Sequence, residues 1–428
     1  MTLSRRQWLQ VSGAALGGAL AHPATAGTPE AATGGNATPP ALAALKPMLD
    51  GVEPIGVDEH RARLARAQAL LAEHGIDALL CGPGTSLRYF TGAQWSVSER
   101  FFGMLLTRTG DPAWVVPAFE ERRGREQVKV GGDVRTWEED ESPYALLAAV
   151  LRERGLVTGR VGIEETTDFA FVNGLAQAAP AARLVNGTPV SAGCRMFKDA
   201  HELALMRRAC AITLAAHRAV FASLREGQTQ AEVAALSAEA HRRLGMPGGS
   251  LVLFGPDAAF PHGTSAPRPL RAGDVVLIDG GGRLHGYASD LTRTAVFGAP
   301  PSDRQRRIWD IVLKAQKTAL AAVRPGVPCE AVDAAARRVI EEAGFGPGYR
   351  YFTHRVGHGM GMDGHEWTYL VKGNATPLRP GMCFSDEPGI YVPGEIGVRH
   401  ECDFFVTPDG AELLDRWPHT PEDPCGPA

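Results

Sequence analysis

One pattern, an apolar strand that ends on a carboxylate and is followed by a second acid, constrains this chain more than any other. Its first copy occupies residues 270–290 and is L-R-A-G-D-V-V-L-I-D-G-G-G-R-L-H-G-Y-A-S-D. The aliphatic run before Asp279 predicts a buried strand. We expect the triple glycine Gly280–Gly282 to reverse the chain, so that a second strand returns and brings Asp290 beside Asp279.

The same pattern recurs in residues 378–389, L-R-P-G-M-C-F-S-D-E-P-G. Glu387 takes the place of the first acid, and Glu401 follows as the second. Upstream of each copy lies a helical pattern between two glycines, and the two intervals, 227–245 and 326–344, are equally long. Self-similarity of this kind predicts a duplicated unit of two helices and a hairpin of strands.

A pseudo-twofold arrangement of the two units would bring four carboxylates to one centre. Like charges raise one another's pKa or attract a cation, and the apolar strands beneath them make an uncompensated cluster costly. Taken alone, the first acid pair is equally well explained by a turn residue and a solvated strand end. The second copy of the pattern favours the other interpretation, which is a dinuclear metal site.

Residues 1–26 have the features of an export signal. A charged start is followed by a short apolar run, Val11–Ala21, and an A-x-A end, whereas a membrane span needs about 20 apolar residues. The pair Arg5-Arg6 matches the twin-arginine signal. We expect the twin-arginine translocase to export the folded protein, which makes it periplasmic or extracellular. An uncleaved anchor is the alternative.

The remainder of the chain is predicted to form two domains after a flexible Gly-, Ala- and Pro-rich tether at 27–40. Residues 41–190 alternate helical and strand patterns and indicate a small α/β domain of three layers. Residues 191–415 hold both copies of the acid pattern, and 416–428 are a C-terminal tail. The expected fold class is α+β. A net charge of −4 argues against a nucleic-acid partner.

Seven cysteines are scattered along the chain without a C-x-x-C pair. Their odd number leaves at least one thiol outside any intramolecular disulfide. Cys383 and Cys402 lie close in sequence to Glu387 and Glu401, which makes them candidate ligands, but a carboxylate-rich site prefers oxygen donors. We interpret both cysteines as buried apolar residues.

Histidines precede each acid pair. His262 lies in F-G-P-D-A-A-F-P-H-G, and three more lie in H-R-V-G-H-G-M-G-M-D-G-H-E, at 354, 358 and 365. The glycines of the second stretch predict an extended strand or loop. Any one of these histidines alone is more simply a structural residue, but three in so short a stretch, with four acids elsewhere, favour a site. The zinc-protease motif H-E-x-x-H is absent because Tyr369 replaces its second histidine.

Together these motifs resemble those of the pita-bread metallopeptidases, in the branch of aminopeptidase P, prolidase and creatinase. The motifs that carry the resemblance are D-G-G-G…S-D-L-T-R-T (279–294), G-H-G-M-G (357–361), D-E-P-G-I-Y (386–391) and G-V-R-H-E (397–401). The resemblance covers nearly all of the chain after the tether. It implies a creatinase-like α/β N-terminal domain followed by a pita-bread catalytic domain of duplicated ααββ units.

The resemblance implies a ligand set of five residues for two divalent ions, with the second acid of each pair bridging them. These ligands are Asp279, Asp290, His358, Glu387 and Glu401. Oxygen ligands with one imidazole favour Mn²⁺, with Co²⁺ or Zn²⁺ as alternatives. A hydroxide held between the ions would be the nucleophile, and Glu387 its general base.

Three further residues are implied to contact or orient the substrate. His262 and His365 match histidines that bind the substrate and stabilise the oxyanion or the departing amine. Arg399 matches a site arginine that either pairs with a carboxylate or holds Glu401, and the sequence does not choose between these. Thr292 is a candidate for supporting a ligand.

The activity implied by the resemblance is hydrolysis of the peptide bond before proline, by an Xaa-Pro dipeptidase or aminopeptidase. Such a bond has no N–H and a fixed φ, so its recognition needs a dedicated pocket. The alternatives are a hydrolase or lyase of a small non-peptide, of creatine, ectoine or sulfonium type, and a binding module that has lost its chemistry. The complete ligand set argues against the creatinase-like and non-catalytic alternatives. The resemblance also implies a homodimer.

Overall fold

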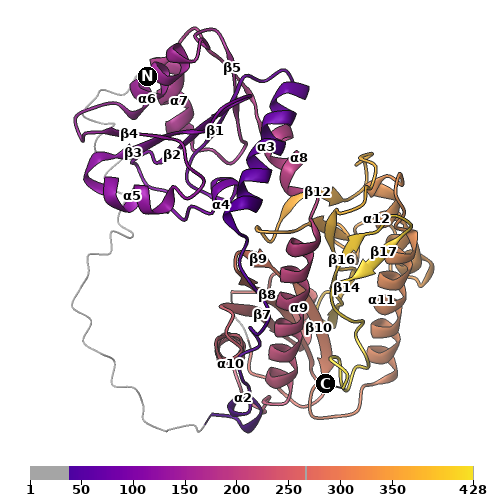
Figure 1. Ribbon diagram of the computed structural model, residues 1–428. Helices are drawn as coiled ribbons and strands as arrows, with labels where there is room; N and C mark the ends of the chain where they lie inside the picture. Colours follow the sequence, from indigo (N-terminus) through magenta and orange to yellow (C-terminus); the bar gives the residue numbers. More distant parts are fainter. Residues whose placement is uncertain (1–37, 266–267, 428) are drawn as a thin grey trace, which may run out of the picture. The chain divides into compact units, whose positions relative to one another are not determined.

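The computed structural model describes residues 38–265 and 268–427 (Figure 1). The expected signal at 1–26 and nearly all of the tether lie outside the described residues, so both stay predictions. Within the described ranges, no helix combines the length and the apolar character needed to cross a bilayer.

The first domain is a six-stranded mixed sheet with helices on both faces. Its strands are β1 (Ala78–Cys81), β2 (Gly103–Thr107), β3 (Ala113–Pro117), β4 (Asp133–Trp137), β5 (Arg160–Ile163) and β6 (Arg183–Asn186). Its helices are α3 (Val57–Glu73), α4 (Thr85–Thr91), η1 (Ala118–Glu120), α5 (Glu121–Gln127), α6 (Pro143–Glu153), α7 (Phe169–Ala178) and α8 (Thr188–Arg195). The short α2 (Pro40–Ala43), which precedes them in the chain, packs on helices of the second domain. The strand order is β4-β3-β2-β1-β5-β6, with β1 parallel to β5 and antiparallel to β2.

Each face of this sheet has its own apolar core. On one face, Leu64 and Leu71 of α3 pack against Leu79. On the other face, α6 and α7 pack against Leu80, the next residue of β1, as the alternation of side chains along a strand requires. The three layers expected from the sequence are therefore confirmed. β4 and β6 were not predicted because both are edge strands with few fully buried residues.

The second domain contains two pairs of helices and three groups of strands. The helices are α9 (Ala200–Phe221), α10 (Gln230–Arg243), η2 (Gly255–Ala259), α11 (Asp303–Ala322) and α12 (Cys329–Glu342). The strands are β7 (Gly248–Phe254), β8 (Val275–Leu284), β9 (Tyr287–Ala288), β10 (Leu291–Val296), β11 (Gly357–Gly359), β12 (Glu366–Leu370), β13 (Cys383–Asp386), β14 (Gly389–Val392), β15 (Ile396–Arg399), β16 (Cys402–Val406) and β17 (Ala411–Leu413). One sheet has the order β10-β8-β7, with β9 paired to β8; another has the order β12-β11-β13-β16-β17, and β14 pairs with β15.

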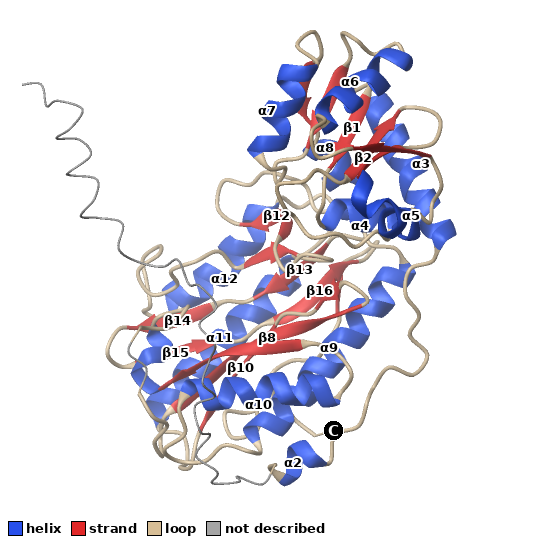
Figure 2. Ribbon diagram, turned by 90° about the vertical axis from the view of Figure 1, so that its left-hand side faces the viewer, coloured by secondary structure: helices blue, strands red, loops and turns tan. Residues whose placement is uncertain are grey.

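Each helix pair covers its own strands (Figure 2). α9 and α10 pack on β7 and β8 through a core that includes Ile212 and Ile278. α11 and α12 pack on the other strands through a core that includes Val312 and Phe384. Three of the helices begin with a reciprocal cap, in which an N-terminal Asp, Thr or Ser and a Glu or Gln three residues later bond each other's backbone N–H. The sequence thus specifies where these helices start.

The predicted duplication is confirmed by matching turn contacts in the two halves. The backbone N–H of Gly227 donates to the carbonyl of Leu270 at 2.8 Å, and that of Gly326 donates to the carbonyl of Leu378 at 2.8 Å. Gly227 and Gly326 have nearly the same φ, +85° and +86°, a conformation that glycine adopts without strain. Each half therefore closes its helix pair onto its acid-bearing strand with the same contact.

The prediction that Gly280–Gly282 reverses the chain is wrong. β8 runs straight through the triple glycine and ends at Leu284, and the turn lies at His285 and Gly286, both at positive φ. The glycines serve close packing instead, because a Cβ on Gly281 would lie 1.9 Å from the carbonyl oxygen of Ser289. The returning strand β10 still pairs with β8, so the expected neighbourhood of the two acids is preserved.

Arg337 ties α12 to the segment that leads to His358. Its guanidinium pairs with Asp333 at 3.0 Å and donates to the carbonyl oxygens of Phe352 and His354 at 2.8 and 2.9 Å. Both side chains of the ion pair are buried. Removing one member of a buried pair leaves the other charge uncompensated, which is strongly destabilising.

We therefore expect Arg337→Met, which keeps the packing of the side-chain stem, to lower the free energy of unfolding by about 3–5 kcal/mol. Denaturant titration followed by tryptophan fluorescence measures this. Arg242→Met is the matched control, because Arg242 pairs with Glu239 on the surface and its loss costs less than about 1 kcal/mol. Equal losses in the two variants would contradict the assignment.

Candidate active site

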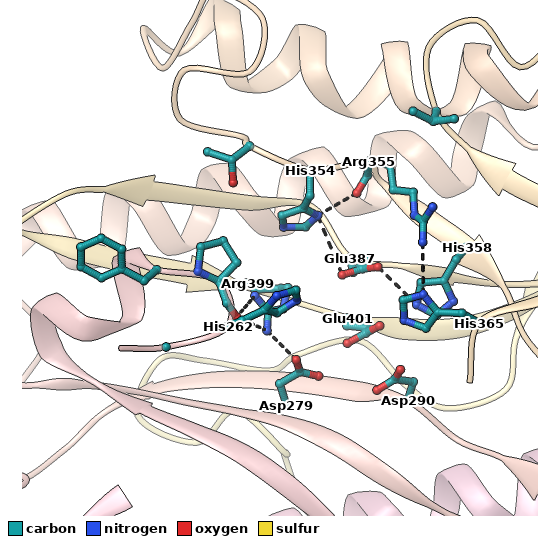
Figure 3. Close-up of a pocket in the computed structure, with 15 residues that line it drawn as sticks. His262, Asp279, Asp290, His354, Arg355, His358, His365, Glu387, Arg399 and Glu401 are labelled. Carbon is teal, nitrogen blue, oxygen red and sulfur yellow. Dashed lines mark hydrogen bonds and ion pairs between the residues drawn. The ribbon is translucent and has the colours of Figure 1, made fainter. Parts of the chain in front are cut away.

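All the predicted metal ligands, with His262, His365 and Arg399, line one cavity of about 700 Å³ (Figure 3). The cavity is lined by Phe260, Pro261, His262, Gly263, Asp279, Asp290, Thr353, His354, Arg355, His358, His365, Val371, Glu387, Arg399 and Glu401. Both halves of the second domain contribute to this lining.

The four acids come from corresponding places in the two halves. Asp279 lies within β8, opposite Thr292 of β10, and Asp290 immediately precedes β10. Glu387 immediately follows β13, and Glu401 lies between β15 and β16. The two hairpins meet in the backbone bond from the N–H of Glu401 to the carbonyl oxygen of Thr292, 3.1 Å long.

These acids and His358 fall into overlapping groups with the spacing of metal ligands. Asp279, Asp290 and Glu401 offer donor atoms that lie within 4.8 Å of one another, and His358, Glu387 and Glu401 do the same. Glu401 belongs to both groups, as a bridging carboxylate must. A third group joins Asp290 and His358 with His365.

His358 presents a neutral ring nitrogen to the acids. Burial, and then the neighbouring His365, lowers the pKa of His358 to about 3. Its Nδ1 lies 3.1 Å from the carbonyl oxygen of Gly359, to which it donates, so the proton is on Nδ1. Nε2 therefore carries the lone pair, and it lies 3.4 Å from Oε1 of Glu387. An imidazole whose Nδ1–H is held by a carbonyl oxygen and whose Nε2 lone pair faces the acids has the arrangement typical of a metal ligand.

Arg399 pairs directly with Asp279 and reaches Glu401 only through Thr292, whose hydroxyl accepts from Nε of Arg399 at 3.3 Å. Its Nη2 donates to Oδ2 of Asp279 at 2.5 Å, and its Nη1 donates to the hydroxyl of Tyr391 at 2.9 Å. Glu401 is held instead by the hydroxyl of Thr292, which donates to Oε2 at 2.6 Å. The structure thus decides a question that the sequence left open.

The cluster carries more negative charge than its surroundings offset. Burial, and then the charge of Asp279, raises the pKa of Asp290 to about 7. Burial also raises the pKa of Glu387 to about 8, against the opposing effect of Arg399, and it raises the pKa of Glu401. Burial acts in the same direction on Asp279, but Arg399 and the hydrogen bonds lower its pKa overall.

The donor set fits a pair of divalent cations. Crowded carboxylates that hold protons at elevated pH are groups that a cation would deprotonate and stabilise. Oxygen donors with one imidazole suit hard and borderline divalent ions. All seven cysteines are free and buried, and in the part of the chain that the structure describes no group of possible ligands includes one. The interpretation of Cys383 and Cys402 as buried residues agrees with this.

His262 and His365 lie at the exposed rim of the cavity. The ring of His365 stacks on that of His358 with 3.8 Å between centroids. Arg355 donates to Nδ1 of His365 at 3.1 Å, and burial and the Arg355 charge lower the pKa of His365. A neutral ring that accepts at Nδ1 has its proton on Nε2. His365 therefore offers an N–H donor.

Two cavity residues received no role from the sequence, although His354 was counted there among the clustered histidines. His354 donates through Nδ1 to the carbonyl oxygen of Arg355 at 2.8 Å, and its Nε2 accepts from the hydroxyl of Tyr391, 2.7 Å away. Tyr391 in turn accepts from Arg399, so this chain of bonds braces the arginine that pairs with Asp279. The other residue is Arg355 itself. Both lie in the motif H-R-V-G-H, which was the available signal.

Comparison with known proteins identifies the family of the chain. The model of the Creatinase/Prolidase N-terminal domain matches residues 63–197, and that of Metallopeptidase family M24 matches residues 204–408. The Xaa-Pro dipeptidase of Lactobacillus helveticus is 33% identical over 368 residues, which cover 84% of this chain and 97% of that protein. The chain belongs to metallopeptidase family M24.

Solved structures of similar chains have the same fold. Dipeptidase PepE from Mycobacterium ulcerans is 36% identical with a TM-score of 0.81, and the match covers 86% of this chain and 99% of that chain. A prolidase from Thermococcus sibiricus is 32% identical with a TM-score of 0.76, covering 83% and 97%. The expected α+β fold, with a creatinase-type N-terminal domain and a pita-bread catalytic domain, is confirmed.

We expect the affinity for Mn²⁺ to increase by at least about tenfold between pH 6 and 8, because binding must displace protons from Asp290 and Glu387. The folded pKa values of both carboxyls exceed their unfolded values, so these groups make the metal-free protein less stable as pH rises from about 4.5 to 8. The metal-loaded protein lacks this loss.

Calorimetric titration in two buffers of different ionisation enthalpy measures both the affinity and the protons released. The difference in melting temperature between loaded and chelated protein should increase over the same range. An affinity for Mn²⁺ that does not change with pH would contradict the competition between the metal and protons for these carboxylates.

Proposed function

We propose that this M24 metallopeptidase is a dinuclear-metal Xaa-Pro dipeptidase, with Mn²⁺ as its ion and Co²⁺ or Zn²⁺ as alternatives. The observation that carries the proposal is the convergence of four acids and the neutral His358 in one cavity. The similar proteins named above as dipeptidase, Xaa-Pro dipeptidase and prolidase support the choice of substrate.

When bound, two divalent ions would activate a water molecule and polarise the scissile carbonyl. The residues of the chain orient the reactants and move protons. Glu387 is the general base, because it lies in the ligand cluster beside His358, where the bound ions would free its carboxylate to accept the proton of the attacking water. The Nε2–H of His365 donates to the oxygen on which negative charge develops. Arg399 keeps Asp279 ionised and fixed.

The rim of the cavity suits the apolar ring of proline. Phe260, Pro261 and Val371 supply apolar surface beside the two rim histidines. The bond before proline has no N–H, so a site for it needs shape and apolar contact rather than an acceptor for a backbone donor. His262 completes this rim and contacts the substrate.

The deciding experiment is hydrolysis of alanyl-proline, alanyl-prolyl-alanine and the matching proline-free peptides by Mn²⁺-loaded protein, with and without chelator. We expect chelator-sensitive, proline-dependent cleavage, with the dipeptide preferred. Preference for the tripeptide would indicate an aminopeptidase instead. No cleavage of any peptide, with metal content verified, would favour a hydrolase or lyase of a small non-peptide.

Glu387→Gln connects this activity to the site. It should lower kcat by at least about 100-fold, the usual contribution of a general base, in protein that is folded and contains metal. Glu395→Gln is the matched control, because Glu395 is exposed and pairs with Arg304, and it should keep full activity. Near-normal hydrolysis by metal-loaded Glu387→Gln would exclude Glu387 as the base.

We further propose that the twin-arginine translocase exports the protein to the periplasm or the medium. The support is the sequence of residues 1–26, with its paired Arg5 and Arg6. Changing both arginines to lysine should retain a protein of full signal length in the cytoplasm, which fractionation and mass measurement detect. Unchanged export of that variant would contradict this route. The homodimer stays a prediction of the family resemblance.

A further inference from the structure

Arg355 brings a positive charge to the wall of the cavity. It is half-buried and follows His354 in the segment that leads into β11. Its side chain extends toward His358 and His365, at one end of the metal-ligand cluster (Figure 3). The mechanism derived above uses the metal ligands, His365 and Arg399, and gives this guanidinium only the hydrogen bond that orients His365.

The guanidinium is held in place from two sides. Nη2 donates to Nδ1 of His365 at 3.1 Å, and the group lies 4.1 Å above the ring of Tyr369. The main chain of Tyr369 is itself fixed, because it pairs with that of His358 across β11 and β12. A guanidinium that is pre-oriented in this way loses little conformational freedom when it binds a ligand.

Arg355 has no acidic partner among the residues that the structure describes. Arg399, the other arginine of the cavity, forms an ion pair with Asp279, whereas the one side-chain hydrogen bond of Arg355 goes to a neutral imidazole. A guanidinium has five N–H donors in a planar fork that matches a carboxylate. Most of these donors are therefore available to a ligand in the cavity.

A dipeptide presents its own C-terminal carboxylate close to the bond that is cleaved. Its terminal carboxylate is one residue from the scissile carbonyl, at most about 3.5 Å along the chain. Arg355 is also close to the reaction centre. It donates a hydrogen bond to His365, whose ring stacks on that of the metal-ligand residue His358. In a longer peptide, the same place is taken by an uncharged amide.

We propose that Arg355 binds the C-terminal carboxylate of the substrate and so restricts the enzyme to dipeptides. The inference rests on the proposed Xaa-Pro hydrolase function and names the residue that sets substrate length. It differs from a purely positioning role, in which Arg355 would act only by holding His365. The two roles predict different responses to removal of the charge from the substrate.

The test compares wild type with Arg355→Gln on alanyl-proline and alanyl-prolinamide, which differ only in the terminal group. Glutamine keeps an N–H donor for Nδ1 of His365 but has no charge. Arg355→Gln should lower kcat/KM for alanyl-proline by about 10–100-fold, the range for a hydrogen bond to a charged group, mostly through KM. For alanyl-prolinamide the change should stay below about threefold.

Arg350→Gln is the matched control. Arg350 is exposed and stacks on Tyr351, and it does not line the cavity. It should leave kcat/KM for both substrates unchanged. A loss as large as that of Arg355→Gln would mean that general charge, rather than a specific contact, is responsible, and would overturn the proposal.

Two other results would overturn it while leaving the hydrolase function intact. One is an equal loss on both substrates in Arg355→Gln, which would assign Arg355 to the support of His365. The other is a wild type that cleaves the acid and the amide equally well. If wild type cleaves no Xaa-Pro bond, the proposed function fails instead. In that case, calorimetry of the binding of proline and prolinamide tests the carboxylate site. The site is overturned if wild type shows no preference for proline over prolinamide. It is also overturned if Arg355→Gln keeps the wild-type preference for proline.

Discussion

Mutual repulsion among four buried carboxylates is the constraint on which the rest of the second domain depends. Each acid is anchored to a strand or strand end, so none can withdraw from the others. One of them, Asp279, is neutralised by Arg399. The remaining acids stay partly protonated or attract cations. The arrangement is unfavourable for the empty protein and favourable for the loaded one, as expected of a site built to bind metal.

The duplicated architecture supplies the anchorage that this repulsion requires. Backbone and side-chain bonds cross from one half to the other beside the acids: Arg293 donates to the carbonyl oxygen of Glu401 at 2.6 Å, and the hydroxyl of Thr294 donates to that of Arg399 at 2.7 Å. Each half thus holds the acids of the other in position. Neither unit would form the site alone, because each contributes only two of the four carboxylates.

Sequence reasoning found the acids because their signal is local and repeated, an apolar run followed by a carboxylate. It failed where the answer depends on contacts between distant segments. The role of Gly281 is set by Ser289, and the partner of Arg399 is set by how β15 lies against β8. For the same reason the sequence assigned no role to His354, one of the clustered histidines, and did not single out Arg355. Both precede β11, and their side chains are held by contacts with Tyr391 and His365, which no periodic pattern reveals.

The glycines of β8 have a consequence for how this protein can diverge. At Gly281 the segment between β9 and β10 approaches so closely that a single added carbon would meet the carbonyl oxygen of Ser289. The separation between Asp279 and Asp290 is therefore set by the packing of main chain against main chain, and no side chain lies between the two segments at Gly281. Aliphatic residues of the cores and rim residues of the cavity can be exchanged over many generations, and the two acids will still stand at one separation. Chemistry and selectivity are thus free to evolve independently in this scaffold.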